Sequence, residues 1–95
     1  MSLIEGFMRK ERIWDAVDAE RARQDAKWGE QNHDDFTWMA ILAEEVGEVA
    51  KAALHHNGDE PGVTASEATL SHLREELVQV AAVAVAWLEA IDRRK

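Results

Sequence analysis

The chain contains no cysteine and a single proline, Pro61. Without cysteine it has neither a disulfide framework nor a thiolate zinc site, which suits a reducing compartment such as the cytoplasm. No run of alternating β-branched residues is present either, so little in the sequence favours strands. The sequence therefore predicts an all-α fold.

Positive charge is scarce, because 11 Lys and Arg stand against 19 Asp and Glu and give a formal net charge of −8. A nucleic-acid polymer favours clusters of Lys and Arg, so no partner of that class is expected. A small phosphorylated ligand is still compatible with this charge, provided that metal ions reverse it locally.

Long hydrophobic runs are also lacking. The longest, Val80–Leu88, is far shorter than the ~20 residues that a bilayer span needs. At the amino terminus the charges follow the short apolar part, whereas in a signal peptide they precede it. We therefore expect a cytoplasmic protein with no membrane partner. Its length predicts one domain, residues 1–95, in which residues 1–9 form a loosely ordered lead-in.

Apolar residues recur at helical spacing and predict three long helices. The polar segment around Gly29 predicts a loop after the first helix, and Asn57–Val63 predicts a turn after the second. The wide apolar stripes of the three helices would leave surface uncovered in a monomer. We therefore expect a four-helix-bundle-type core completed in a homodimer or a dimer of dimers. The expected helices are Lys10–Ala26, Asp34–His56 with Asp34 or Asp35 as its cap, and a third from a capping box at Thr64–Glu67 to about Asp92, with Leu70 as a candidate break.

The second helix places acidic residues on its apolar side. In "ILAEEVGEVAKAAL", Glu45 falls inside the stripe that includes Leu42 and Val46, and Glu48 lies at its edge. A globular helix normally keeps its acids on the solvent face. Two inward carboxylates need partners, and a divalent cation is a suitable partner.

The third helix shows the same feature. Glu76 projects between Val83 and Trp87 on the apolar side, and Gln79 follows near the edge, while Glu75 points further outward. If the two helices pack antiparallel through their stripes, one oxygen-lined site can form. The converging residues would be Glu45, Glu48, Glu76 and Gln79.

The motifs "EEVGE" at Glu44–Glu48 and "EELVQ" at Glu75–Gln79 resemble the EExxE…ExxD signature of the MazG-like nucleoside triphosphate pyrophosphohydrolases, of the all-α NTP pyrophosphatase superfamily. The segment "ERARQDAKWGEQNHDDFTWMAILAEEVGEVAKA" is similar to the leader of small MazG-like proteins, so the resemblance covers about residues 13–92. It implies an oligomeric helical bundle that binds Mg²⁺, with Mn²⁺ as a substitute. Such enzymes hydrolyse a nucleoside triphosphate between the α- and β-phosphates to the monophosphate and pyrophosphate.

By this resemblance, Glu45 and Glu48 are metal ligands from the first motif and Glu76 is one from the second. Gln79 stands where the family pattern has Asp. Its amide oxygen can still coordinate Mg²⁺, but the lost negative charge predicts weaker binding. The candidate catalytic carboxylates, which would orient the attacking water, are Glu44, Glu45 and Glu75.

Trp28 and Trp38 bracket the loop before the second helix. Either indole can stack on a nucleobase, although Trp38 lies on the apolar stripe and suits the core better. Asn32 or His33 would contact the polar edge of the base. The end of the first helix, with Glu20 and Gln24 on its stripe, either runs into solvent or lines a wet pocket. The candidate substrate-binding residues are Gln24, Lys27, Trp28, Asn32, His33 and Trp38.

Other polar residues have two interpretations each. Four cations could contact phosphates or be ordinary surface charges, since Lys51 can pair with Glu48 and Arg74 lies on the outer side of its helix. The histidines suggest zinc, but solvated side chains are the favoured interpretation. The cations are Arg23, Lys27, Lys51 and Arg74, and the histidines are His33, His55, His56 and His72.

Two functions from different classes fit the sequence. The first is a Mg²⁺-dependent nucleotide pyrophosphohydrolase acting on a small-molecule nucleoside triphosphate. The alternative is a non-catalytic MazG-like oligomerisation or regulatory module in which Gln79 has weakened metal binding.

Overall fold

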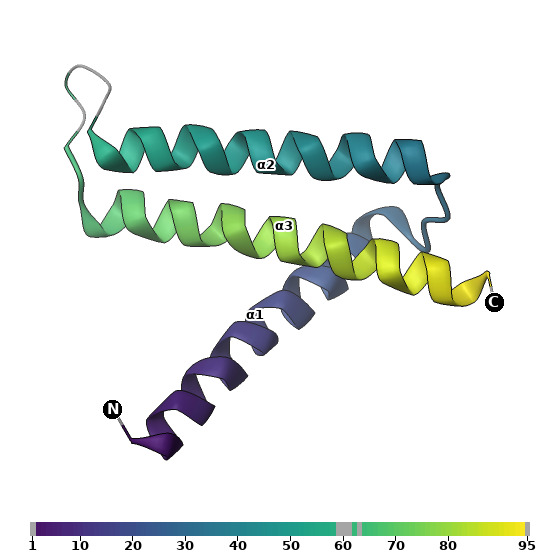
Figure 1. The fold of residues 1–95 in the computed structure, drawn as a ribbon, viewed down its shortest axis with the longest axis horizontal. Coiled ribbons are helices and arrows are strands. Elements are labelled where there is room, and N and C mark those ends of the chain that lie inside the picture. Colours follow the sequence, from purple (N-terminus) through teal and green to yellow (C-terminus); the bar gives the residue numbers. More distant parts are fainter. Residues whose placement is uncertain (1, 59–61, 63, 95) are drawn as a thin grey trace.

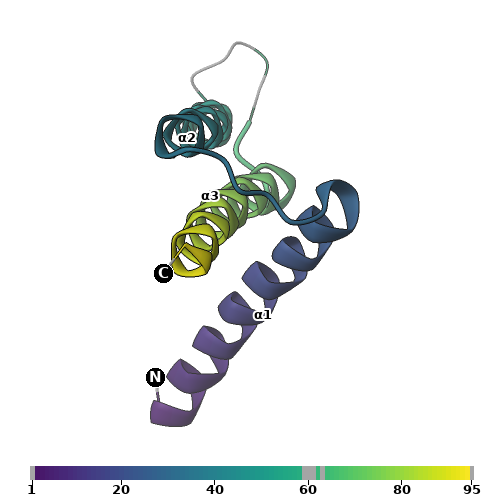
Figure 2. The same cartoon turned by 90° about the vertical axis from the view of Figure 1, so that its right-hand side faces the viewer.

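The computed structural model describes residues 2–58, 62 and 64–94, and these form three helices and no strand. The helices are α1 (Leu3–Trp28), α2 (Asp35–Asn57) and α3 (Glu67–Arg93). α2 and α3 lie side by side and antiparallel, and α1 crosses α3 on the side away from α2 (Figures 1 and 2). The predicted all-α class is confirmed.

α1 begins earlier in the chain than predicted. Ser2 caps it, because its side-chain oxygen accepts a hydrogen bond from the Glu5 backbone N–H at 3.1 Å. The predicted start near Lys10 is therefore wrong, and residues 3–9, expected in a loosely ordered lead-in, are helical; residue 1 lies outside the described residues. α1 ends at Trp28, where Gly29 has a φ of 71° that favours glycine.

Both ends of α2 agree with the prediction from sequence. The Asp34 side chain accepts a hydrogen bond from the Thr37 backbone N–H at 2.8 Å, which identifies Asp34 as the cap. At the other end Gly58 adopts the left-handed conformation, with a φ of 78°. The turn predicted after this point lies partly outside the described residues, because residues 59–61 and 63 are not among them.

α3 has a different cap from the predicted one. The Ser66 side chain accepts from the Thr69 backbone N–H at 3.2 Å, and the Thr69 hydroxyl accepts from the Ser66 backbone N–H at 2.9 Å. The capping box predicted at Thr64–Glu67 is therefore wrong, because Ser66 and Thr69 form the reciprocal pair. The candidate break at Leu70 is also wrong, since the helix continues through it without interruption.

The core lies between α2 and α3 around Trp38, which is only 2% exposed. Alanines at positions 86 and 90 of α3 bring the backbones close enough for the indole to fill the space between the helices. Near the same end, the Trp87 indole N–H donates to the Asp35 carboxylate at 3.0 Å and joins the start of α2 to α3. The core cluster comprises Trp38, Val83, Ala86 and Ala90, with Ile41, Leu42 and Trp87 packed against it.

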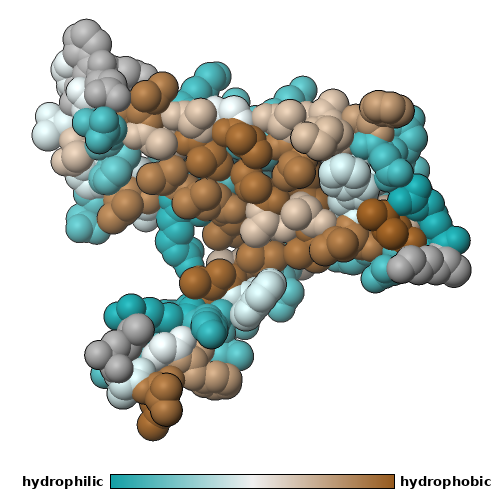
Figure 3. Space-filling view, viewed as in Figure 1, coloured by the Kyte–Doolittle hydropathy of each residue, from teal (hydrophilic) through white to brown (hydrophobic). Residues whose placement is uncertain are grey.

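Much apolar surface is left uncovered in one chain. Apolar side chains gather along α2 and α3 and at the free end of α1, which extends away from the other two helices (Figure 3). Phe7 is 64% exposed and Leu88 is 59% exposed. None of the helices in the described part of the chain has the length and hydrophobicity to cross a membrane.

Candidate functional site

Glu45 lies near enough to carboxylates of all three helices for their charges to act on it. Burial raises the pKa of the Glu45 carboxyl, and the negative charges of Glu76, Glu48, Glu20 and Glu44 raise it further. Acids from the two predicted motifs are therefore close together, as the antiparallel packing hypothesis requires.

The pairing of α2 with α3 explains this convergence. Asp35 contacts Trp87 at one end of the pair, and His56 contacts Thr69 at the other, with Nδ1 and Oγ1 2.7 Å apart. In this antiparallel register, the middle of α2 with Glu45 lies opposite the part of α3 that carries the second motif. His56 is thus held by α3, and its interpretation as a solvated histidine is wrong.

Glu20 was not among the site residues predicted from the sequence. It is 6% exposed and Gln24 is 8% exposed, so the polar end of the α1 stripe is buried against the other helices and does not run into solvent. The Glu20 carboxylate accepts hydrogen bonds from Arg23, with the Nε donor at 2.8 Å. The signal that could have identified Glu20 is its place on the same helical stripe as Val17.

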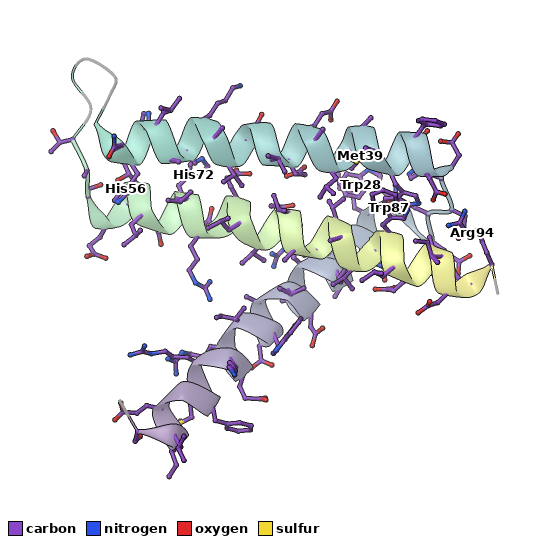
Figure 4. All side chains as sticks on the ribbon, viewed as in Figure 1. Trp28, Met39, His56, His72, Trp87 and Arg94 are labelled. Carbon is purple, nitrogen blue, oxygen red and sulfur yellow. The ribbon has the colours of Figure 1, made fainter. Side chains whose placement is uncertain are left out.

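Two basic side chains, Lys51 and His72, lie near acids of this cluster. Lys51 Nζ lies 3.7 Å from the Glu48 carboxylate, which is the surface pair predicted from their spacing. His72 lies between α2 and α3 (Figure 4), with Nε2 3.7 Å from Glu76 and Nδ1 3.9 Å from Glu75. Both contacts are longer than hydrogen bonds, so they leave the carboxylate oxygens available to other ligands.

The donor chemistry of this cluster fits a hard divalent cation, since Mg²⁺ prefers carboxylate and amide oxygens. Within the described residues, however, no three histidine or acidic side chains form a ready-made ligand group as they are oriented. Glu48 has a side chain that is 52% exposed and can rotate, whereas that of Glu76 is 18% exposed. An ion could be held here only if these side chains turned toward one another.

A cavity of about 280 Å³ opens beside the acids at the junction of the three helices, where Figure 4 shows Trp28. It combines carboxylates with two aromatic side chains, as a site for a charged ligand with an aromatic ring requires. The residues that line it are Gln24, Trp28, Gln31, Trp38, Ile41, Glu44, Glu45, Gln79, Val83 and Ala86.

A second cavity of about 260 Å³ adjoins the first one. It adds Lys27, whose ammonium group lies 4.6 Å from the centre of the Trp28 ring and interacts with its face. Four of the six predicted substrate-binding residues thus lie around the two cavities. The second cavity is lined by Glu20, Arg23, Gln24, Lys27, Trp28 and Gln79.

The other two predicted substrate-binding residues lie outside these cavities. Asn32 donates to Glu30 at 2.9 Å and accepts from Arg93 at 2.9 Å, so its amide fixes the loop between α1 and α2. The His33 ring meets the Trp38 ring edge-on, with centroids 4.9 Å apart. Among the described residues neither His33 Nε2 nor Trp38 Nε1 has a hydrogen-bond partner, although both atoms are buried.

Glu75 and the metal candidates Glu48 and Glu76 also lie outside the lining of the Trp28 cavities. The Glu75 side chain is 76% exposed. Glu75 lines a neighbouring groove between α1 and α3, which shares Glu20, Arg23 and Gln79 with the second cavity. Of the three candidate catalytic carboxylates, Glu44 and Glu45 therefore stand nearest to the tryptophans.

On the far side of Trp38, a further cavity of about 400 Å³ was missed in the sequence. Its wall contains a strong ion pair in which Arg21 Nε donates to Glu89 at 3.0 Å and its Nη2 donates to Asp25 at 2.9 Å. Arg21 lowers the pKa of the Glu89 carboxyl mainly through this hydrogen bond. Arg21 and Glu89 are far apart in the sequence, so no local pattern signals their contact.

No protein-family model, curated protein or solved structure matches this chain.

Proposed function

We propose that this protein is a Mg²⁺-dependent nucleoside triphosphate pyrophosphohydrolase, which converts a triphosphate to the monophosphate and pyrophosphate. One observation carries the proposal: the charges of carboxylates from all three helices act on Glu45, which itself lines a cavity containing Trp28. A polyphosphate needs charge neutralisation, and a nucleobase needs an aromatic or apolar surface. The cavity places both requirements side by side.

The base would lie against Trp28, whose side chain is 56% exposed and free to stack on it. Gln24 is buried in the same wall, where its amide can donate to or accept from the edge of the base. Lys27 already lies over the Trp28 ring, and from there its ammonium group can reach a phosphate oxygen.

Glu45, Glu48, Glu76 and Gln79 would hold the ion by rotation of their side chains toward one another. Bound Mg²⁺ would supply neutralisation of phosphate charge, which the protein alone cannot provide next to so many carboxylates. Gln79 contributes a neutral oxygen that lines both cavities beside Trp28. We therefore expect weaker ion binding than an Asp at this position would give.

Glu44 is suited to accept a proton in the hydrolytic step, because it lines the same cavity as Glu45 and is not among the proposed ion ligands. A water oxygen forms a bond to the α-phosphorus while the α–β bridging P–O bond breaks. The bridging oxygen leaves with pyrophosphate, and the proton of the water passes to the carboxylate.

A second candidate function is a non-catalytic oligomerisation or regulatory module. The observations that favour it are Gln79 in place of an acid and the lack of a ready-made ligand group among the described residues. We propose in either case that the exposed apolar surfaces of α1 and α3 are covered in a homodimer or a dimer of dimers, which would complete a four-helix core.

The deciding experiment incubates the protein with a panel of canonical and modified nucleoside triphosphates and Mg²⁺, and measures pyrophosphate release. We expect release that falls by at least about a hundredfold in Glu45→Gln. Glu11→Gln, which changes an exposed acid of α1, is the matched control and should release pyrophosphate at the wild-type rate. No release from any triphosphate, together with a melting temperature that does not respond to Mg²⁺, would support the regulatory module instead.

A further inference from the structure

A groove of about 450 Å³ runs between α1 and α3 on the side of the acids away from Trp38. Two arginines from different helices line it, Arg23 of α1 and Arg74 of α3. The sequence had placed Arg74 on the outer side of its helix, but α1 packs there and makes that side one wall of the groove. The complete lining is Ala16, Ala19, Glu20, Arg23, Arg74, Glu75, Val78 and Gln79.

This groove adjoins the two cavities beside Trp28. Glu20, Arg23 and Gln79 line both the groove and the neighbouring cavity, which in turn shares Trp28 with the cavity at Trp38. We refer to these three adjoining spaces together as the trough. Tryptophans lie at one end of the trough, Gln79 lies in its middle, and Arg74 lies at the other end.

The cations along this trough differ in whether another side chain already binds them. Lys27 lies against the Trp28 ring, and Arg23 is paired with the buried Glu20 carboxylate. In the described part of the chain no carboxylate lies within ion-pair distance of Arg74. Arg74 therefore offers an uncommitted guanidinium at the end farthest from the tryptophans.

Guanidinium groups recognise phosphates through paired N–H donors, and a pyrophosphate group presents several oxygens to them at once. We propose that the α1–α3 groove holds the β- and γ-phosphates against Arg74 and Arg23, so that pyrophosphate leaves through this groove. This inference rests on the proposed function, because it assigns a direction to a triphosphate that the proposed function places in the trough. The base lies at Trp28, the α-phosphate lies beside Glu45, and the two distal phosphates lie between α1 and α3.

Arg74→Ala tests the groove more clearly than a substitution of Arg23 does. Removing Arg23 leaves the buried Glu20 carboxylate without its partner and so disturbs folding, whereas Arg74 pairs with no carboxylate among the residues that the structure describes. The first measurement titrates inorganic pyrophosphate into the full chain by calorimetry in buffer with Mg²⁺. We expect Arg74→Ala to weaken pyrophosphate binding about tenfold, and Arg74→Lys to restore part of it. Arg12→Ala, an exposed arginine of α1 outside the groove, should bind as the wild type does.

A second measurement separates this groove from a general charge effect. A non-hydrolysable triphosphate analogue should lose affinity in Arg74→Ala, while the corresponding monophosphate, which lacks the distal phosphates, should bind unchanged. Equal pyrophosphate affinity in wild type and Arg74→Ala would overturn the inference even if triphosphates are hydrolysed. Arg74-dependent pyrophosphate binding without hydrolysis of any triphosphate would support the groove as an anion site and contradict only the proposed enzymatic function.

Discussion

Glu45 of α2 lies close enough to Glu76 of α3 that the Glu76 charge, after burial, raises the pKa of the Glu45 carboxyl across the interface that forms the core. Burial of a carboxylate and like charges at a helix interface both oppose folding, and the raised pKa of Glu45 reflects both costs. Only a ligand that binds both carboxylates would turn the repulsion into attraction. The pair therefore links the stability of the free protein to the function proposed for it.

Glu45→Gln should stabilise the free protein at neutral pH. The unfolded carboxyl titrates near 4.5 and the folded one above that value, so the ionised form destabilises the fold at any pH above the folded pKa. We expect a gain on the order of 1 kcal/mol at pH 7, or ~4–8 °C in melting temperature for a chain of this size. As the pH falls to about 4.5 the folded carboxyl takes up its proton first, and the gain should disappear.

Urea denaturation without divalent cations measures the free energy of unfolding at pH 7 and at pH 4.5. Glu11→Gln is a control of equal charge change. A Glu45→Gln protein that is less stable than the wild type at pH 7 would show that Glu45 makes favourable contacts that outweigh the repulsion.

Glu89→Gln should have the opposite pH dependence. Arg21 holds the pKa of the Glu89 carboxyl below its ordinary 4.5, so the pair stabilises the fold above that pH and loses its effect as the pH falls through the folded pKa. Because the Glu89 side chain is 42% exposed, we expect a cost of only about 0.5–1.5 kcal/mol at pH 7. Chemical denaturation at neutral and acidic pH measures it, and a cost that persists in acid would contradict the ion-pair explanation.

Trp28→Ala should weaken nucleotide binding and leave the fold almost unchanged. The indole is 56% exposed, so its loss removes a stacking surface for the base with little buried area. We expect KM for the best triphosphate to rise about tenfold, from a stacking energy of ~1–3 kcal/mol, with a smaller change in kcat. Trp14→Ala is the matched control, because Trp14 lies on the same helix, is 59% exposed and lines none of the three spaces of the trough. Equal effects of the two variants on KM would contradict the assignment of Trp28 to the base.

Phe7→Glu and Leu88→Glu should shift the protein toward the monomer. Both side chains are exposed apolar groups, on α1 and α3, and a charge there would be buried without a partner if a second chain covered it. Light scattering at micromolar concentration should give a dimer or tetramer for the wild type and a smaller mass for the variants. A monomeric wild type would contradict the proposed assembly.

The helices and the acidic cluster could be predicted because they depend on local rules. Asp34 and Gly58 mark the ends of α2 through capping and left-handed geometry, and the phase of Glu45 on its helix follows from a fixed rotation per residue. The cap of α3 was misplaced because Thr64 and Ser66 are both good capping residues and the choice between them depends on where the preceding turn delivers the chain.

The position of α1 could not be predicted in the same way. Its apolar stripe indicates which side is buried, but the angle at which it crosses α3 depends on how ridges and grooves of both helices fit. That angle brings Arg21 to Glu89 and Arg74 to the groove, so both contacts were missed. The burial of Glu20 follows from the same crossing.

The amino-terminal half of α1 should open locally more often than the rest of the helix. Residues 3–15 are exposed apart from the half-buried Gly6, so hydrogen bonds along the backbone hold them with little help from side-chain packing. A helical segment of this length is marginal in water by itself. Its amide protons should therefore exchange with deuterated solvent far sooner than those near Val17, and they should become protected when a second chain covers Phe7.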